Sequence, residues 1–231
     1  MQRVISPEWL DELPAGDPRA RRSRRDLQRI NSLMGHAACV AGILERALSG
    51  SGAGHLVELG AGDGTFLLEV LRRLPRHVPI KQVTLVDRAA SDSAEARAGF
   101  AGLDCAATFA RADVFDWLNE TRETPVILAN LFLHHFPDAD LARLLRLAAA
   151  RTRIFIACEP RRSWLSLSGS RLLGLIGCNA VTRHDAVISV RAGFAGDELS
   201  RLWPKSGDWQ TDERERGLFS HTFAARRLAG E

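Results

Sequence analysis

The feature that most limits how this chain can fold is an alternation of short apolar runs with helix-like segments through residues 57–157. The runs are continuously apolar, which is typical of strands that are buried on both faces of a parallel sheet. Crossover connections between such strands are nearly always right-handed, so we expect an open, doubly wound α/β sheet. The expected strands are 55–59, 83–87, 107–114, 125–129 and 153–157, and the expected helices are 66–74, 91–100, 139–150 and 196–203.

Two further strand-like segments, 209–213 and 218–224, predict an antiparallel hairpin at the sheet edge and bring the sheet to seven strands. Residues 1–50 have apolar side chains at helical spacing and no clear strand, so they predict an N-terminal helical preface that covers the domain as a lid. The main domain is then 51–231, and its segment 161–195 is expected to be a lid insertion over the substrate.

A glycine-rich loop follows the first expected strand, with the sequence Glu58-Leu-Gly60-Ala-Gly62-Asp-Gly64-Thr65. Glycines allow a tight turn and the close approach of a ligand, and ligands of open α/β sheets bind beyond the carboxyl ends of the strands. A phosphate-binding P-loop requires a lysine that this loop lacks. The dinucleotide pattern GxGxxG is also absent, because Thr65 stands where its third glycine would fall.

The pattern GxGxG behind an acidic residue resembles motif I of the class I S-adenosylmethionine (SAM)-dependent methyltransferases, which have a Rossmann-like fold. The resemblance implies that SAM is the cofactor and S-adenosylhomocysteine (SAH) the product. Asp87 ends the second expected strand, where the family places the carboxylate that binds the ribose hydroxyls; Asp113 follows the third, like the family residue that binds the adenine. The cofactor-binding residues implied in this way are Glu58, Gly60, Ala61, Gly62, Asp87, Arg88, Asp113, Val114 and Asn130.

Methyl transfer from a sulfonium requires alignment and, for a weak nucleophile, a base. The candidates are His134 and His135, just after the fourth expected strand, and His184, which Asp185 can orient. Weaker candidates are His221 on the last strand and the carboxylate of Glu159. The alternative for each histidine is a structural hydrogen bond. No group of residues has the sequence spacing of a metal site, so no metal is expected.

The apolar residues of segment 161–195 are interpreted either as part of the core or as the lining of an acceptor pocket. Arg161, Arg162 and Arg183 are polar elements of the same segment. An apolar pocket with few polar groups suits a small aromatic, polyketide-like or quinone-like acceptor, with O-methylation expected. The resemblance extends loosely to bacterial methyltransferases of secondary or quinone metabolism.

The charge, the cysteine spacing and the lengths of the apolar stretches limit the partners and the cellular location that we expect. The formal net charge is +3, which does not require a polyanionic partner, and four scattered cysteines form no CxxC pair. No signal peptide and no apolar stretch of membrane-spanning length are visible, so a cytoplasmic protein without a membrane span is expected. A homodimer through the preface is a further possibility.

Three other functions compete with a small-molecule enzyme. A nucleic-acid methyltransferase would place (D/N)PPY after the fourth strand or use a Pro-Cys nucleophile, and neither pattern occurs; no nucleic-acid partner is therefore expected, although RNA or protein acceptors stay as alternatives. A SAM-binding accessory protein without turnover is the second. An NAD-dependent oxidoreductase is the third, and the glycine spacing disfavours it.

Overall fold

The computed structural model describes residues 1–14, 16–48, 54–75, 77–78, 80–89 and 94–228. Its strands form one seven-stranded sheet in the order β3-β2-β1-β4-β5-β7-β6, in which β7 runs antiparallel to β5 and β6. This confirms the expected doubly wound sheet with a terminal antiparallel hairpin. The strands are β1 (His55–Leu59), β2 (Gln82–Asp87), β3 (Ala106–Arg111), β4 (Thr124–Asn130), β5 (Thr152–Pro160), β6 (Trp209–Arg216) and β7 (Ser220–Arg227).

The register brings the carboxyl ends of the central strands to one edge of the sheet. Leu59 of β1 pairs with Val86 of β2 on one side and with Ala129 of β4 on the other. The side chains of these three residues are buried, because apolar runs in central strands can face covering helices on both sides. The loops that follow β1, β2 and β4 therefore start next to one another, and they form the site described below.

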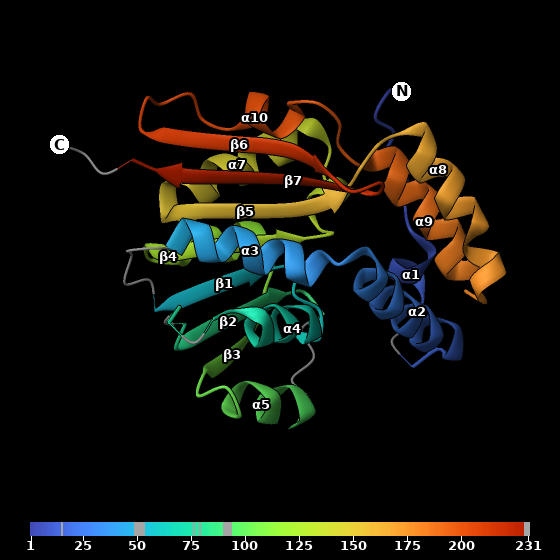
Figure 1. The fold of residues 1–231 in the computed structure, drawn as a ribbon, viewed down its shortest axis with the longest axis horizontal. Coiled ribbons are helices and arrows are strands. Elements are labelled where there is room, and N and C mark those ends of the chain that lie inside the picture. The colour runs from blue at the N-terminus through green and yellow to red at the C-terminus, as the bar shows by residue number, and fades with distance from the viewer. Residues whose placement is uncertain (15, 49–53, 76, 79, 90–93, 229–231) are drawn as a thin grey trace.

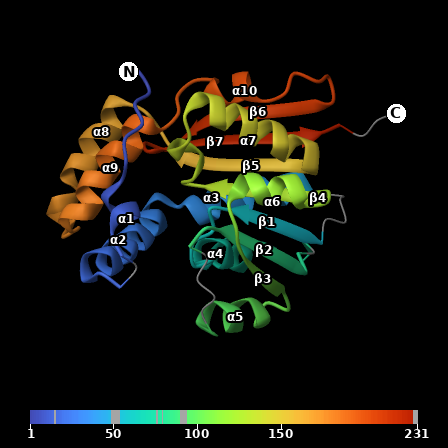
Figure 2. The same cartoon turned by 180° about the vertical axis from the view of Figure 1, so that it is seen from behind.

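Helices cover both faces of the sheet (Figures 1 and 2). On one face α4 places Leu67, Val70 and Leu71 at helical spacing against the sheet, and the cluster on this face also includes α3 and α5. The face helices are α3 (His36–Leu48), α4 (Thr65–Arg73) and α5 (Ala94–Ala101) on one side, and α6 (Val114–Glu120), α7 (Asp138–Arg151) and α10 (Glu198–Leu202) on the other.

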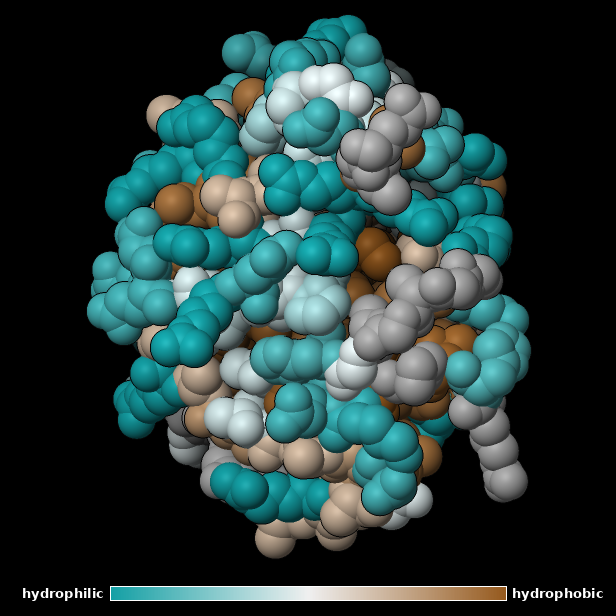
Figure 3. Space-filling view, turned by 90° about the vertical axis from the view of Figure 1, so that its left-hand side faces the viewer, coloured by the Kyte–Doolittle hydropathy of each residue, from teal (hydrophilic) through white to brown (hydrophobic). Residues whose placement is uncertain are grey.

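A group of helices, here called the helical cap, lies beyond the carboxyl ends of the parallel strands (Figure 1). The longest helix of the cap starts at Pro18, where the preceding Asp17 side chain accepts a hydrogen bond from the Arg19 amide. Gly35, with a positive φ of 68°, follows its last residue and ends the helix. The opposite end of the molecule has a mainly hydrophilic surface (Figure 3). The cap consists of α1 (Trp9–Glu12), α2 (Pro18–Met34), α8 (Trp164–Arg171), the 3-10 helix η2 (Leu172–Ile176) and α9 (Ala180–Ala192).

The structure departs from the sequence-based expectation in a few elements. The third strand ends at Arg111, because the Asp113 side chain accepts a hydrogen bond from the Phe115 amide and starts the unexpected helix α6. Helix α9 was also not expected. The expected preface divides, since α3 packs into the sheet core while α1 and α2 belong to the helical cap. The expected boundary at residues 50 and 51, and the expected start of α5 at residue 91, lie outside the described residues.

The described helices include none that combines the length and the apolar character needed to cross a membrane.

Candidate active site

The glycine-rich loop turns sharply between β1 and α4. Gly60, Gly62 and Gly64 all have positive φ values, of 72°, 54° and 75°. A side chain at Gly60 would also collide with the Phe132 ring, because an added Cβ would lie 2.2 Å from Phe132 Cδ2. The loop therefore requires glycine at Gly60 both for its backbone conformation and for the close approach of the segment after β4.

Asp87 holds the loop from the end of β2. One of its carboxylate oxygens accepts a hydrogen bond from the Gly62 amide at 2.9 Å, and the other accepts one from the Ala89 amide at 2.7 Å. A carboxylate has about four acceptor positions, and these two hydrogen bonds leave some of them unused. Asp87 can therefore accept further hydrogen bonds from a ligand.

A cavity of about 610 Å³ opens next to this loop, and we call it the loop cavity. Most of the residues expected to bind the cofactor line it. Glu58, Ala61, Gly62 and Asn130 are not in its lining but belong to the loop and strand ends beside it. The expected residues in its wall are Gly60, Asp87, Arg88, Asp113, Val114, His134 and His135.

Two buried polar atoms lie at the strand ends behind the loop cavity. Among the described residues, no hydrogen-bond partner reaches Glu58 Oε2 or Asn130 Oδ1. Burial raises the pKa of Glu58 well above its ordinary value, and the negative charges of Asp63 and Asp87 add to this effect. The site thus holds unused acceptor capacity beside the carboxylates of Asp63 and Asp87, an arrangement that favours a ligand with a cationic hydrogen-bond donor.

A second cavity of about 420 Å³ lies between the helical cap and the sheet, and we call it the apolar cavity. Leu27, Ile30 and Met34 of α2 line one part of it, and Leu173 and Ile176 of η2 line another. The side chains of segment 161–195 that were expected to be either core or pocket therefore include pocket-lining residues. The acidic and imidazole side chains of this cavity all belong to residues that also line the loop cavity, and its other polar residues are an asparagine and three serines.

The two cavities share a wall made of Glu8, Asp11, Leu131, His134 and His135. Leu131, the first residue after β4, has a positive φ of 50°, which is an uncommon and strained conformation for a non-glycine residue. This turn leads directly into the 3-10 helix η1 (Leu133–His135), which carries both histidines. The strained residue therefore lies in the shared wall, where molecules bound in the two cavities would meet.

Glu159 at the end of β5 holds η1 in place. Its Oε1 accepts hydrogen bonds from the amides of Phe132, at 3.0 Å, and Leu133, at 2.9 Å, and its Oε2 lies 2.8 Å from His134 Nδ1. Glu159 is fully buried, and its bonds to Leu133 and His134 are shielded from water. The carboxylate was only a weak candidate from sequence, yet it fixes the backbone and the ring of a candidate catalytic histidine.

His134 is a buried imidazole between two carboxylates. Burial by itself would lower the pKa of His134, but Glu159 at Nδ1 and Glu8 near Nε2 together raise it to about 9. His134 is therefore protonated at neutral pH. Burial also disfavours the charged form of Glu8, but the two imidazoles outweigh this and hold the pKa of Glu8 well below its ordinary value.

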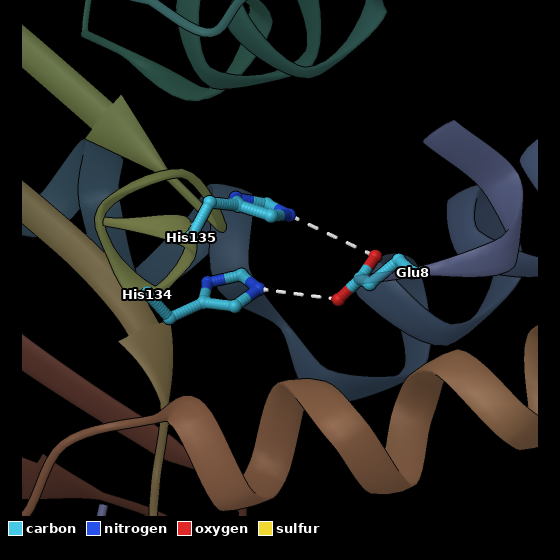
Figure 4. A group of neighbouring side chains, drawn as sticks. All are labelled: Glu8, His134 and His135. Atoms are coloured by element: carbon cyan, nitrogen blue, oxygen red, sulfur yellow. Dashed lines mark ion pairs between the residues drawn. The ribbon is translucent and has the colours of Figure 1, made fainter. Parts of the chain in front are cut away.

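His135 lies beside His134, with ring centroids 4.1 Å apart. Its Nδ1 is 3.0 Å from the carbonyl oxygen of Phe132. A carbonyl oxygen can only accept, so Nδ1 carries the proton, and in the neutral ring Nε2 keeps a free lone pair. Figure 4 shows that both rings turn Nε2 toward the Glu8 carboxylate.

Glu8 has no counterpart in the sequence-based prediction, since the N-terminal segment carries no motif or periodicity that would point to it. The structure fixes it through its neighbours. Arg3 donates hydrogen bonds to the carbonyls of Ala192, His134 and Phe136, and the Asp185 carboxylate accepts from the amides of Trp9 and Leu10. The Ser189 hydroxyl donates a hydrogen bond to Glu8.

The other candidate histidines lie elsewhere. The ring of His184 stacks on Trp9 with centroids 3.7 Å apart, its Nδ1 is 2.9 Å from Asp185, and it is not among the residues that line either cavity. His221 is buried on β7 with Nε2 2.7 Å from Glu213, and it is absent from the same two linings. The geometry thus brings together His134, His135 and the weaker candidate Glu159 from the predicted set, and it adds Glu8.

Residues 56–153 match the family described as "Methyltransferase domain". This segment contains β1 to β4, the glycine-rich loop, Asp87, Asp113 and both histidines of η1. No curated protein matches the chain in sequence.

Several solved structures share the fold. An O-methyltransferase family protein from Burkholderia thailandensis is 18% identical with a TM-score of 0.60, over 94% of this chain and 65% of that one. The plantazolicin methyltransferase BpumL, in complex with a triazolic desmethylPZN analog and SAH, is 13% identical with a TM-score of 0.67, over 92% of each chain. The mitomycin 7-O-methyltransferase MmcR is 20% identical with a TM-score of 0.60, over 95% of this chain and 60% of that one. This chain therefore spans less than two thirds of the first and third proteins and most of the second.

Proposed function

We propose that this chain, whose residues 56–153 match a methyltransferase domain family, is a class I SAM-dependent methyltransferase that transfers the methyl group of SAM to a hydroxyl oxygen of a small, largely apolar acceptor. The observation that carries the proposal is the pair of cavities. One borders the glycine-rich loop, the other is apolar, and both end at Glu8, His134 and His135. A methyl donor in the first and an acceptor in the second would meet at these side chains.

The residues around the loop cavity fit SAM chemically. SAM carries a sulfonium and an ammonium group, and the loop region offers the carboxylates of Glu58, Asp63 and Asp87. Glu58 has an oxygen without a described partner, so a nearby ammonium group would both satisfy it and favour its charged form. Asp87 would accept from the two ribose hydroxyls, and Asp113 and Val114 would contact the adenine, as the family resemblance implies.

The apolar cavity supports an aromatic or polyketide-like acceptor. Its side chains come from α2, η2 and α9 and from Phe219, which is consistent with contact to a ring or an alkyl chain. The acidic and imidazole side chains of the cavity all lie at the end where the loop cavity begins. An acceptor would therefore direct its hydroxyl group toward the histidines and its apolar part into the helical cap.

The two histidines would have different roles in methyl transfer. When SAM is bound it supplies an activated methyl group, so the protein has to align the acceptor and remove the hydroxyl proton. In the neutral His135 ring the lone pair is on Nε2, and this side chain is our candidate for the base. His134 is already protonated between Glu159 and Glu8, so it would stabilise negative charge on the acceptor oxygen and act as a positioning residue.

The first experiment is calorimetric titration of the full chain with SAM and SAH, with NAD as a negative control. We expect SAM and SAH to bind and NAD not to bind. Asp87→Asn should weaken SAM binding by about tenfold or more, since it removes hydrogen bonds to a charged acceptor worth about 1.5–3 kcal/mol each. Asp208→Asn, an exposed acid outside both cavity linings, is the matched control. Wild-type protein that is folded but binds neither compound would overturn the proposal.

The acceptor is identified by incubating the chain with SAM and a panel of phenols and hydroxyquinones, with products read by mass spectrometry. We expect an O-methyl product and a fall of about 10²–10⁴ in kcat for His135→Gln. Products methylated only on carbon or nitrogen would contradict the O-methylation, and SAM binding without transfer to any acceptor would support the accessory-protein alternative. The homodimer expected from the sequence stays a prediction, which sedimentation of the purified chain would test.

A further inference from the structure

Glu8, His134 and His135 form a cluster in which two imidazole rings face one carboxylate. One potential ligand atom from each of the three residues lies within 4.8 Å of the other two. His134 Nε2 is 3.6 Å from Glu8 Oε1, and His135 Nε2 is 3.7 Å from Glu8 Oε2. Each ring thus addresses a different oxygen of the same carboxylate, as Figure 4 shows.

These separations are too long for hydrogen bonds, which bring nitrogen and oxygen to about 2.7–3.2 Å. They are close to the spacing of atoms that share a metal ion. With bonds of about 2.0–2.1 Å to nitrogen or oxygen, the ligands of a tetrahedral ion lie roughly 3.3–3.4 Å apart. Each of the two histidine–carboxylate distances is therefore within a few tenths of an ångström of the distance between two ligands of one ion.

The far side of each ring is fixed in the way that metal-binding histidines require. His134 Nδ1 lies 2.8 Å from Glu159, and His135 Nδ1 lies 3.0 Å from the Phe132 carbonyl oxygen. A carboxylate or carbonyl at one ring nitrogen sets the tautomer and turns the other nitrogen toward the ion. Glu159 is itself held by backbone amides, so both rings are oriented before any ion binds.

We infer that Glu8, His134 and His135 bind a divalent transition-metal ion of the Zn²⁺ type at the junction of the two cavities. Two imidazoles and one carboxylate suit Zn²⁺ and its neighbours, whereas Mg²⁺ and Ca²⁺ prefer sites made of oxygen atoms. Three protein ligands leave coordination positions open toward the cavities. The use of this ion rests on the proposed function, because an open position there can bind the hydroxyl oxygen of an acceptor. Metal binding would displace the Nε2 proton of His134 to solvent and use the Nε2 lone pair of His135. In the metal-bound state the ion, in place of these two side chains, would then favour loss of the acceptor's hydroxyl proton.

Sequence spacing could not have predicted this site. Metal-site patterns depend on ligands at short, regular intervals, and here Glu8 is far along the chain from the two histidines. The sequence therefore gave the expectation of no metal. The N-terminal segment supplies the third ligand only because Arg3 and Asp185 hold it beside η1.

The test is titration of the tag-free, chelator-treated full chain with ZnCl₂ by calorimetry and with CoCl₂ by visible absorption. We expect one ion per chain, Co²⁺ bands typical of nitrogen and oxygen ligands, and no comparable binding of Mg²⁺. Glu8→Gln and His135→Gln should each weaken Zn²⁺ binding by more than about 100-fold, and Glu159→Gln should weaken it by about 10–100-fold, because it only orients a ligand. His77→Gln, at an exposed histidine, is the matched control and should have no effect.

The site would be overturned if the wild-type chain bound Zn²⁺ no more tightly than Glu8→Gln and His135→Gln, with circular dichroism showing that all three are folded. It would equally be overturned if His77→Gln weakened binding as much as the ligand variants did. Titration of the same metal-free sample with SAM separates the two proposals. SAM binding without Zn²⁺ binding would remove the metal site alone, whereas loss of SAM binding in folded wild-type protein would remove the methyltransferase proposal.

Discussion

At the scale of single residues, the glycine-rich loop depends on backbone conformation, whereas the histidines of η1 depend on their side-chain partners. The glycines of the loop adopt the positive φ values that their residue type permits, and Asp113 both caps α6 and lines the loop cavity. His134 was recognisable as a candidate because it follows a strand end. Its partners Glu8 and Glu159 come from other parts of the chain, so the pairing required the folded structure.

Gly60→Ala tests the residue-scale account of the loop. The substituted residue would have to keep a φ of 72°, which costs about 1–2 kcal/mol, and its Cβ would press on the Phe132 ring. We expect the free energy of unfolding, measured by urea denaturation, to fall by more than about 2 kcal/mol. We also expect SAM affinity to fall at least tenfold. Gly207→Ala, which has open space around the added methyl group, is the control. Equal behaviour of the two variants would contradict this account.

At the scale of elements, apolar periodicity located the strands and the face helices other than α6, but it gave little information about the cap. Helix α9 has a weakly amphipathic sequence, and its start depends on the Asn179 side chain, which accepts a hydrogen bond from the Thr182 amide. The cap is joined by buried polar contacts: Asp26 of α2 accepts from the Asn179 amide and from the Thr182 hydroxyl. Such contacts between distant elements leave no periodic pattern in the sequence.

The N-terminal segment is the element that completes the active site, and Arg3 is its anchor. The Arg3 side chain is largely buried, contacts three carbonyls and Asp138, and lies over the Phe194 ring. Arg3→Ala should cost about 1–3 kcal/mol of unfolding free energy and release Glu8 from the histidines. Hydrogen exchange should then accelerate at the amides of Val4, Trp9 and Leu10.

Arg153→Ala is the control for that experiment. Arg153 forms an exposed ion pair with Glu123, and such pairs contribute about 0–1 kcal/mol. We expect hydrogen exchange in the N-terminal segment to stay unchanged in this variant. If Arg3→Ala also left exchange at Val4, Trp9 and Leu10 unchanged, Arg3 would not be the anchor of the segment.

At the scale of the whole molecule, the fold brings segments that are far apart in the chain into buried contact, and one such contact affects the stability of the protein at acidic pH. His36 at the start of α3 is fully buried, with Nε2 2.7 Å from the Ser220 hydroxyl of β7. Burial lowers the pKa of His36 from its ordinary 6.5 to about 4. Between these values the unfolded chain binds a proton that the folded chain does not, so stability falls as the pH falls.

The predicted effect is measured by urea denaturation at several pH values. From about pH 7 to about pH 4.5, the titration of His36 should remove about 2 kcal/mol of unfolding free energy. A His36→Gln variant should lose correspondingly less over this range, whatever its stability at pH 7. The other titrating groups are present in both proteins, so the difference between the two pH dependences reports the contribution of His36. The same acid-induced loss in both proteins would show that His36 does not carry it.

The amino-acid sequence by itself determined the sheet, the loop conformation and the order of the chemical groups along it. These depend on interactions within short stretches: burial of apolar runs, helical periodicity, and the φ values available to glycine. The tertiary structure alone decided which groups meet. Strand order placed Glu159 beside η1, and the docking of residues 1–8 brought Glu8 to His134 and His135. Those contacts join residues that are far apart in the chain, and their geometry follows from packing, which no local pattern encodes.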